Sequence, residues 1–309
     1  MDVYNLSERI GLSAREFVNL LQAMGEEEKA SSLRLVSKTA LSAETFKKFR
    51  QQFPELLLPI NNFFVLNPKG KDLLAKLLNQ RANFKESDGA RILQLFKDYA
   101  DARPKPKREY DQFYSVPETQ VDRVKLLYEQ NEMSDASIIF LGDDDLTSVC
   151  LALLGDAKRI VVIDIDSAQI EIINKMAREL NLKIETYHHD LKNPVPKDLM
   201  HKFDLVFTDP PYTPNGFQLF LQREIECAKG ISSSIYICYG NSERAGERFL
   251  PVQKIINDLS LEVLFAYHTF NKYTGAESIG SSSNLYVLRP TQMTKSAKKP
   301  DLTKIYTYE

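Results

Sequence analysis

The sequence contains no hydrophobic run close to the roughly 20 residues that a helix needs to cross a bilayer. The first ten residues, MDVYNLSERI, also lack the basic segment followed by an apolar one that marks a signal peptide. These two absences predict a protein of the cytoplasm with no membrane partner.

Cysteine is scarce and charge is nearly balanced. The three cysteines, Cys150, Cys227 and Cys238, are widely spaced within apolar segments, which favours reduced core thiols over disulfides or a metal site. The 40 basic and 42 acidic residues give a net charge of −2, so no global charge calls for nucleic acid or an anionic membrane. We therefore expect no metal and no nucleic-acid partner.

The 309 residues, 43% of them hydrophobic, are enough for two domains with an ample core. The composition changes in DYADARPKPKREYDQF, where Pro104 and Pro106 stand among charges and forbid a continuing helix. We predict an N-terminal domain over residues 1–105, a second domain over 106–290 and a C-terminal tail over 291–309.

The N-terminal domain is predicted to be mostly helical. NLSERIGLSAREFVNLLQAMG reads as a helix, a turn at Gly11 and a second helix capped by Ser13, and LSAETFKKFRQQF reads as a further helix. FFVLNPKGKDLLAKLLNQ predicts a short strand, a Pro-Lys-Gly turn and a helix. This order resembles a winged-helix domain, either for DNA binding or for packing and dimerisation. Glutamates outnumber basic residues between positions 11 and 30, which favours packing.

After the linker, strand and helix patterns alternate, which predicts an α/β fold: a parallel sheet covered by helices on both faces. Ligands of such sheets bind beyond the carboxyl ends of the strands. Polar clusters follow five predicted strands, and we expect them to converge on one pocket. They are Gly142 to Asp145, Asp164 with Asp166, Asp190, TDPPYT at 208–213, and Tyr239 to Asn241.

Two of these aspartates allow either a nucleoside contact or a local structural role. Asp164 follows the strand-turn glycine at the spacing of an acid that holds ribose hydroxyls, but it could equally cap the next helix. Asp190 could accept a hydrogen bond from an adenine amino group or cap a turn. His188 and His189 are interpreted as packing or surface residues.

The tetrapeptide DPPY at 209–212 is more specific. Two prolines after a strand fix a rigid turn, which holds Asp209 and Tyr212 beside an incoming group. In adenosylmethionine-dependent enzymes that modify amino groups, this tetrapeptide lines the acceptor nitrogen. Together with the predicted ribose contact, it indicates a nucleoside co-substrate and an amine.

The turn SIIFLGDDDLTS carries three consecutive carboxylates where such turns usually bind an anion. Two unit charges about 6 Å apart repel by roughly 3 kcal/mol at an effective dielectric near 20, so a cation is needed to offset their crowding. Asp143, Asp144 and Asp145 would repel the carboxylate of adenosylmethionine but favour decarboxylated adenosylmethionine and a polycationic acceptor. The alternative is a solvated acidic loop.

Five motifs together resemble the branched-chain polyamine synthases, the N(4)-bis(aminopropyl)spermidine synthase family. They are EYDQFYSVPETQVDRV at 109–124, GDDD at 142–145, DID at 164–166, DPPYT at 209–213 and KYTGAESIGSSS at 272–283. The resemblance implies a Rossmann-like methyltransferase-type domain and a dimer. It also implies decarboxylated adenosylmethionine as co-substrate, with no tightly bound cofactor and no metal.

The resemblance implies that Asp144 is the candidate base or acceptor-orienting group. Asp209, the other acid placed to reach the acceptor nitrogen, is the second candidate catalytic acid. Candidate substrate-binding residues are Asp143, Asp145, Tyr212, Gln112 and Glu118, and candidate residues for the nucleoside co-substrate are Gly142, Asp164, Asp190 and Pro210.

The sequence thus predicts an aminopropyltransferase that acts on a spermidine-type polyamine and releases methylthioadenosine. Two alternatives stay open: an amino-group methyltransferase that uses intact adenosylmethionine, and a DNA-binding regulator suggested by the N-terminal domain alone. The acidic turn opposes the first, and the acidity of the N-terminal helices opposes the second. The sequence leaves open whether the C-terminal TKIYTYE closes over the site.

Overall fold

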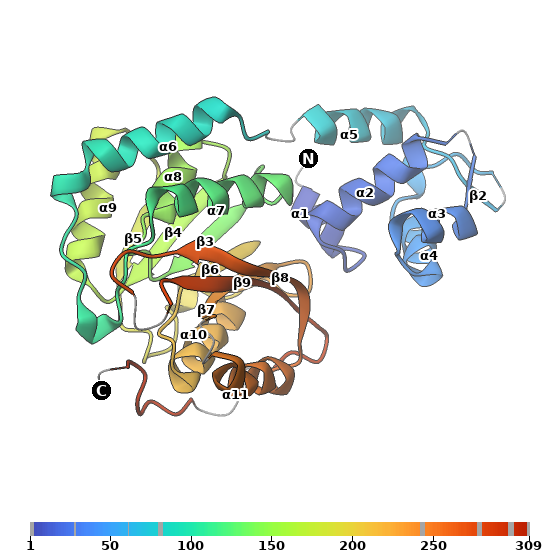
Figure 1. Cartoon of the computed structure of the whole chain (residues 1–309). Coiled ribbons are helices and arrows are strands. Elements are labelled where there is room, and N and C mark those ends of the chain that lie inside the picture. The colour runs from blue at the N-terminus through green and yellow to red at the C-terminus, as the bar shows by residue number, and fades with distance from the viewer. Residues whose placement is uncertain are drawn as a thin grey trace.

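The computed structural model describes residues 3–27, 29–60, 62–79, 83–241, 245–276, 280–295 and 300–307. A small helical unit lies beside a larger α/β unit (Figure 1). The small unit contains α1 (Val3–Glu8), α2 (Ala14–Gly25), α3 (Ser32–Thr39), α4 (Ala43–Gln52), α5 (Pro68–Asn79) and the antiparallel pair β1 (Ala30–Ser31) and β2 (Phe63–Phe64).

The small unit confirms most of the predicted local structure. Ser13 caps α2 in a capping box with Glu16, which satisfies amides that the first turn leaves unpaired. The predicted Pro-Lys-Gly turn is wrong: Pro68 opens α5, because proline has no amide hydrogen to lose at a first helical position. Phe17, Phe49 and Phe53 pack into one aromatic core. The winged-helix assignment stays a prediction.

The larger unit contains a seven-stranded sheet in the order β5-β4-β3-β6-β7-β9-β8. The strands are β3 (Ser137–Leu141), β4 (Arg159–Asp164), β5 (Glu185–His188), β6 (Leu205–Thr208), β7 (Ser234–Gly240), β8 (Leu261–Lys272) and β9 (Ser282–Pro290). All five residues of β3 are buried, as expected for a central strand covered on both faces.

The α/β fold of the Rossmann-like methyltransferase type is confirmed, with one difference in strand direction. Strands β3 to β7 are parallel, but β9 pairs antiparallel with both β7 and β8. The pattern of apolar residues predicts that a strand exists but not its direction, so the sequence does not distinguish the antiparallel strands β8 and β9 from parallel ones.

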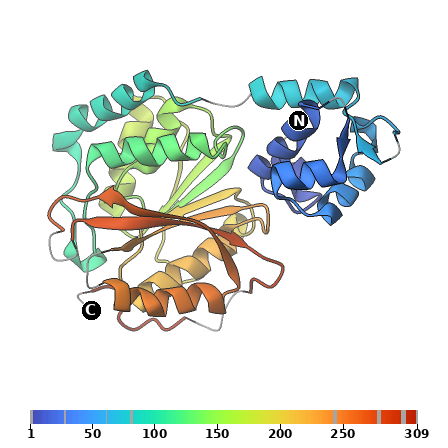
Figure 2. The ribbon, with the colours of Figure 1, turned by 45° about the vertical axis from the view of Figure 1, so that its right-hand side comes forward.

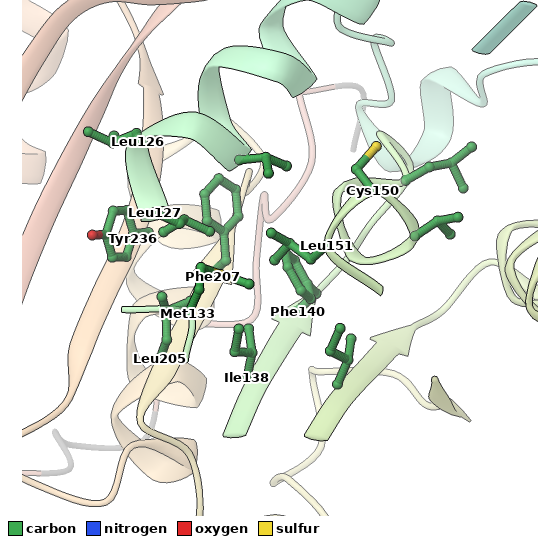
Figure 3. Close-up of a cluster of buried hydrophobic side chains, with 14 of the residues drawn as sticks. Leu126, Leu127, Met133, Ile138, Phe140, Cys150, Leu151, Leu205, Phe207 and Tyr236 are labelled. Carbon is green, nitrogen blue, oxygen red and sulfur yellow. The ribbon is translucent and has the colours of Figure 1, made fainter. Parts of the chain in front are cut away.

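Helices cover both faces of the sheet (Figures 1 and 2). One face carries α6 (Glu86–Asp98), α7 (Pro117–Glu129), α8 (Thr147–Leu154) and α9 (Ser167–Glu179), and the other carries α10 (Pro214–Cys227) and α11 (Ala245–Asp258). Figure 3 shows the first core, where Leu127 of α7 and Leu151 of α8 pack over Phe140 and Phe207 of the sheet.

Helix α6 packs against α7 and α8 and shares their core, whereas the core of the N-terminal helices ends at Leu77 of α5. We therefore place the domain boundary between α5 and α6, ahead of the linker predicted around Pro104 and Pro106. Those prolines follow the end of α6, but the chain that carries them stays on the α/β unit, where Tyr114 donates a hydrogen bond to the Pro104 carbonyl (2.8 Å).

The two units are joined by charged and aromatic contacts. Arg289 of β9 donates two hydrogen bonds to the carboxylate of Glu16 in α2, at 2.8 and 2.9 Å. The guanidinium of Arg15 lies over the Phe265 ring of β8, 4.9 Å from its centre. The N-terminal unit is thereby fixed on the antiparallel edge of the sheet.

The three cysteines are buried and free, as predicted for core thiols. Of the helices in the described ranges, none is both long and apolar enough to cross a membrane.

Candidate active site

A cleft opens beyond the carboxyl ends of β3, β4, β5 and β6, where the strand order reverses. Its empty volume is about 550 Å³ when the part that is open to solvent is included. Among the described residues, its lining contains four aspartates and one histidine but neither lysine nor arginine. The lining residues are Tyr110, Asp111, Gln112, Gly142, Asp144, Ile163, Asp164, Ile165, His189, Leu191, Asp209, Pro211, Phe220 and Tyr306.

The turn after β3 begins at Gly142, which lines the cleft with a φ of 75°. Asp143 then turns inward: its carboxylate accepts hydrogen bonds from the amides of Thr147 (2.8 Å) and Ser148 (3.0 Å) at the start of α8. Burial raises the pKa of Asp143 to about 7, although these hydrogen bonds oppose the rise. Asp143 therefore caps the N-terminus of α8. It does not line the cleft, so its position gives no support to the predicted substrate contact.

Asp145 also points inward. Its Oδ1 accepts a hydrogen bond from the Ser115 amide (2.7 Å), and its Oδ2 accepts one from Nη1 of Arg123 (2.9 Å). The two ion-paired side chains are 3% and 1% exposed. Because a guanidinium remains charged when buried, Asp145 is its internal counterion. Like Asp143, it does not line the cleft.

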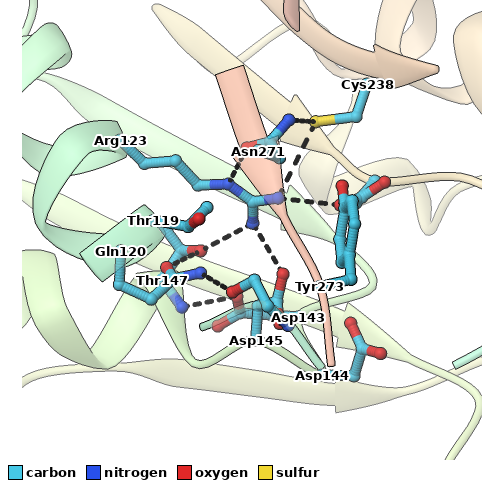
Figure 4. A network of polar contacts seen from close by, with 12 residues as sticks. Thr119, Gln120, Arg123, Asp143, Asp144, Asp145, Thr147, Cys238, Asn271 and Tyr273 are labelled. Atoms are coloured by element: carbon cyan, nitrogen blue, oxygen red, sulfur yellow. Dashed lines mark hydrogen bonds and ion pairs between the residues drawn. The ribbon is translucent and has the colours of Figure 1, made fainter. Parts of the chain in front are cut away.

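Asp144 is the member of the triplet that lines the cleft. Figure 4 draws its side chain without a dashed contact to the other residues shown. Its backbone carbonyl accepts a hydrogen bond from Arg103 Nη2 (2.9 Å), whereas no group in the described part of the chain donates to its carboxylate. Burial raises the pKa of this carboxyl well above its ordinary value, and the charges of Asp145, Asp209 and Asp164 raise it further. A carboxylate in this setting is suited to pair with a cationic ligand and to accept a proton from it.

Asp164, the last residue of β4, lines the cleft and connects two turns. Its Oδ2 accepts a hydrogen bond from the Asp143 amide (3.1 Å), and its Oδ1 accepts one from the Asp166 amide (2.8 Å). The helix cap that was the alternative role is supplied by Asp166, which accepts from the Ala168 amide (2.9 Å). Burial raises the pKa of Asp164 to about 6. Ribose binding by Asp164 stays a prediction, and its place in the cleft supports it.

Gln112 reaches the cleft beside the same turn. Its Nε2 donates to Asp166 Oδ2 (3.2 Å), and Lys107 Nζ donates to Asp166 Oδ1 (2.7 Å). Lys107 is thus paired with an aspartate behind the cleft wall. This arrangement fits the substrate-binding role predicted for Gln112, which stays a prediction.

The DPPY turn follows β6 as predicted and brings Asp209 into the cleft. The Tyr212 hydroxyl donates to Asp209 Oδ1 (2.9 Å), and the Tyr273 hydroxyl donates to Oδ2 (2.6 Å). Arg123 Nη2 also donates to Oδ2, at 2.7 Å. Burial raises the pKa of Asp209, although Arg123 opposes the rise. Asp209 is therefore present at the site but engaged by three protein donors.

The two prolines of this turn face different ways. Pro211 lines the cleft, whereas Pro210 is buried and does not line it. The position of Pro210 gives no support to the nucleoside contact predicted for it. Tyr212 is held through its hydroxyl against Asp209 and, at 3.0 Å, the Tyr273 hydroxyl.

Other predicted positions lie away from the cleft lining. Glu118 is exposed in the first turn of α7, and Asp190 caps a turn by accepting the amide two residues on, at 2.8 Å. Gly240 and Asn241 line a second cleft, between α11 and the antiparallel strands. The prediction of a single pocket is wrong at the end of β7. The Tyr212 ring packs against Gly240 and separates the two clefts. Residues 277–279 of the KYTGAESIGSSS motif lie outside the described residues.

The C-terminal segment forms one wall of the cleft. The Thr213 hydroxyl lies 2.9 and 2.7 Å from the carbonyl oxygens of Lys304 and Ile305, and the Ile305 side chain is fully buried. Tyr306 then lines the cleft. A Cβ atom on Gly216 would lie 2.6 Å from the Ile305 carbonyl oxygen, so this packing requires glycine.

Sequence reasoning missed Arg123, Lys107 and Tyr306 as site residues. For Arg123 a signal existed, since it precedes the apolar positions Val124 and Leu127 in an amphipathic helix where a lone arginine needs a buried partner. The partner of Lys107 lies 59 positions away in the sequence, and the Tyr306 ring packs against the distant Tyr110 ring. No local sequence pattern predicts such long-range pairs.

Within the described ranges there is no group of three or more His, Cys, Asp or Glu side chains placed to hold a metal ion.

The strand order and the acid-lined cleft at its reversal define a Rossmann-like domain of the methyltransferase type, with a site suited to a cationic ligand. The chain belongs to the branched-chain polyamine synthase family: residues 91–307 match the family described as the branched-chain polyamine synthase A C-terminal domain. The resemblance inferred from the sequence motifs is confirmed.

Individual relatives agree with this membership. The chain is 34% identical over 226 residues to the N(4)-bis(aminopropyl)spermidine synthase of Thermococcus kodakarensis, covering 69% of this chain and 64% of that one. An uncharacterised protein of Methanocaldococcus jannaschii is 36% identical over 246 residues, covering 80% and 61%. The chain thus spans less than two thirds of the length of these curated relatives.

A solved structure shows the same fold. The branched-chain polyamine synthase of Thermus thermophilus, crystallised with N4-aminopropylspermidine and 5'-methylthioadenosine, aligns with a TM-score of 0.62 over 97% of both chains, at 20% sequence identity. At this level of identity, the similarity establishes a shared fold and nothing further.

Proposed function

We propose that the protein is an aminopropyltransferase that moves an aminopropyl group from decarboxylated adenosylmethionine to a polyamine nitrogen and releases methylthioadenosine. One observation carries the proposal: the described lining of the cleft holds four aspartates and no lysine or arginine. Such a lining favours ligands that are cationic throughout, which describes both the sulfonium donor with its amine arm and the polyamine.

The positions of the acids suggest a division of work. Asp164 and the turn at Gly142 lie where a Rossmann-like fold binds a nucleoside. Asp144 and Asp209 lie at the ends of neighbouring strands, where the reacting carbon and nitrogen would meet. Asp144 is the proposed base because its carboxylate has no donor among the described residues, whereas Asp209 is held by Arg123 and two tyrosines.

The reaction is a displacement at carbon. An aliphatic amine with a pKa near 10.4 is charged at pH 7, and freeing its lone pair costs about 3.4 pKa units, or roughly 4.6 kcal/mol. Asp144 accepts the proton, the nitrogen lone pair forms a bond to the methylene beside the sulfonium, and the carbon–sulfur bond breaks. Its electrons return to sulfur, which leaves as the neutral thioether methylthioadenosine. Holding both reactants in line supplies much of the remaining acceleration.

The methyltransferase alternative fits the cleft less well. Intact adenosylmethionine carries a carboxylate, which would need a cationic or amide partner close to the acid triplet. Lys107 is already paired with Asp166, Arg123 is paired with Asp145 and Asp209, and Arg103 donates through Nη2 to the Asp144 carbonyl. A DNA-binding regulator gains no support from an acid-lined cleft of this kind.

The finer parts of the proposal rest on the family. A spermidine-type acceptor is proposed because the Thermus thermophilus relative was crystallised with N4-aminopropylspermidine. A cytoplasmic location and catalysis without metal are proposed from the sequence, and a homodimer is proposed on the family resemblance.

The test is mass spectrometry of the purified chain incubated with decarboxylated adenosylmethionine or intact adenosylmethionine and a panel of diamines, spermidine and N4-aminopropylspermidine. The expected products are aminopropylated amines and methylthioadenosine. They should form only with the decarboxylated donor, and a chelator should not prevent their formation. Methylated amines formed from the intact donor would establish the alternative.

A further inference from the structure

We propose that Arg123 is a positioning residue for this transfer: its guanidinium holds Asp145, behind the cleft, and Asp209, in the cleft lining, as fixed anions, so that Asp144 is left to receive the proton. This inference rests on the proposed function and assigns a role within it to a residue that has no contact with the cleft.

The surroundings of Arg123 are unusual for a cation. It lies on α7, is 1% exposed, and its guanidinium stands over the Phe207 ring of β6, 5.2 Å from the ring centre. Its neighbour Val124 is also fully buried. Taking a guanidinium out of water is costly unless its donors are satisfied by anions and acceptors of good geometry.

All three nitrogens of the guanidinium have partners, and each comes from a different part of the fold (Figure 4). Nη1 donates to Asp145 after β3 at 2.9 Å, and Nη2 donates to Asp209 after β6 at 2.7 Å. Nε donates to Asn271 Oδ1 of β8 at 2.8 Å. The planar guanidinium can make these three contacts at once, which the single ammonium of a lysine cannot reproduce.

The contacts fix which carboxylates remain available. Asp145 uses its second oxygen for the Ser115 amide, and Asp209 uses its oxygens for the hydroxyls of Tyr212 and Tyr273. Both acids are therefore held as acceptors. Asp144 precedes Asp145 in the turn and lines the cleft together with Asp209. Its carboxylate has no such donor among the described residues, so its lone pairs are available to a ligand.

The charges around Asp144 come from four elements. Asp145 lies next to it in the turn after β3, Asp164 ends β4, Asp209 follows β6, and Arg103 lies between α6 and α7. The three acids raise the pKa of Asp144, and Arg103 lowers it. Because Arg123 neutralises part of the charge of Asp145 and Asp209, its loss would leave more uncompensated negative charge beside Asp144 and raise that pKa further.

A purely structural role for Arg123 makes a different prediction. As a brace between α7 and two strand ends, it would affect stability and the fraction of active protein. It would leave the pH dependence of the active fraction unchanged.

The experiment compares Arg123→Gln and Arg123→Lys with the unchanged chain. It measures kcat and KM for the polyamine from pH 6 to 10, and it measures methylthioadenosine affinity by calorimetry. For Arg123→Gln we expect kcat at neutral pH to fall about 100-fold, within the range of a lost acid–base contribution. The acidic limb of kcat/KM should move to higher pH by about one unit, while methylthioadenosine affinity stays within about threefold. Arg123→Lys keeps the charge but not the fork, so kcat should fall about tenfold with a smaller shift.

Lys229→Met is the matched control. Lys229 Nζ donates to Asp204 Oδ1 at 2.6 Å, a cation paired with a buried aspartate at the opposite end of β6. Its loss should lower stability and leave the acidic limb in place.

The positioning role is overturned if the acidic limb stays where it is in both Arg123 variants and turnover falls only with the folded fraction, as circular dichroism reports it. If Arg123→Gln does not fold, Arg123→Lys decides: an unchanged pH profile and kcat overturn the proposal. Absence of aminopropylated product from the unchanged chain is a separate result, which contradicts the proposed function itself.

Discussion

The backbone amide of Asp143 donates a hydrogen bond of 3.1 Å to Oδ2 of Asp164, and so the turn after β3 is tied to the end of β4. Asp164 also accepts the Asp166 amide through Oδ1. One carboxylate therefore sets the relative position of the two turns that form the proposed nucleoside side of the cleft.

We expect Asp164→Asn to weaken methylthioadenosine binding by about 10- to 100-fold, the loss of a charge-assisted hydrogen bond worth about 1.5–3 kcal/mol. Isothermal titration calorimetry measures it. Asp190→Asn is the comparison: its carboxylate caps a turn outside the cleft lining, so affinity should change less than about threefold. Equal effects of the two changes would return the nucleoside contact to Asp190.

Methylthioadenosine binding should depend on pH through the same residue. Burial raises the pKa of Asp164 to about 6, so its carboxylate is ionised at pH 7.5 and mostly protonated at pH 5. Affinity should fall as the pH is lowered through 6, because the protonated acid accepts hydrogen bonds poorly. The Asp164→Asn variant should lack this fall, and a fall of equal size in the variant would assign the pH dependence to another group.

Donor choice should follow from the charge of the cleft. Decarboxylated adenosylmethionine should bind at least about tenfold more tightly than intact adenosylmethionine, because only the intact donor brings a carboxylate toward four aspartates. Competition calorimetry against methylthioadenosine at low and high salt measures the difference. Equal affinities at low salt would remove the electrostatic argument.

Asp144→Asn should lower turnover by at least about 100-fold and leave donor affinity near normal, since asparagine keeps the size of the side chain but cannot take the proton. Raising the pH toward the pKa of the acceptor amine should restore part of the rate. Asp122→Asn, on the exposed face of α7, is the control. Full turnover of Asp144→Asn at neutral pH would show that Asp144 is not the base, and Asp209 would become the candidate.

Glu224 of α10 is fully buried, and neither of its carboxyl oxygens has a hydrogen-bond partner among the described residues. Burial raises its pKa well above the ordinary value. The unfolded chain ionises this acid above about pH 4.5 while the folded chain keeps it protonated, so its effect on stability worsens as the pH rises.

Glu224→Met should therefore raise the free energy of unfolding by about 1–3 kcal/mol at pH 8 and by less at pH 5. Urea denaturation at the two pH values measures it. Glu171→Met, on the exposed face of α9, supplies the comparison. A gain that does not grow with pH would mean that Glu224 ionises in the folded protein.

The sequence predicted the parts of the fold and site that depend on local pattern. The apolar runs predicted the positions of the strands. The polar residues that follow each strand could therefore be identified from the sequence, but their contacts in the fold could not. Asp143 shows the limit: as a member of GDDD it is equivalent to Asp144, and only the start of α8 determines that it faces the amides of Thr147 and Ser148. Likewise, α6 packs against α7 and α8, which come later in the chain, so no local pattern predicts which unit it joins.

On the proposed reaction, the acid-lined cleft treats the two products unequally. Methylthioadenosine leaves without the sulfonium charge, whereas the polyamine keeps its charges and gains one further amine. The four aspartates therefore hold the product polyamine more strongly than the spent nucleoside. A fresh donor can then replace methylthioadenosine while the polyamine is still bound, so the lining favours processive addition of aminopropyl arms over release after each one.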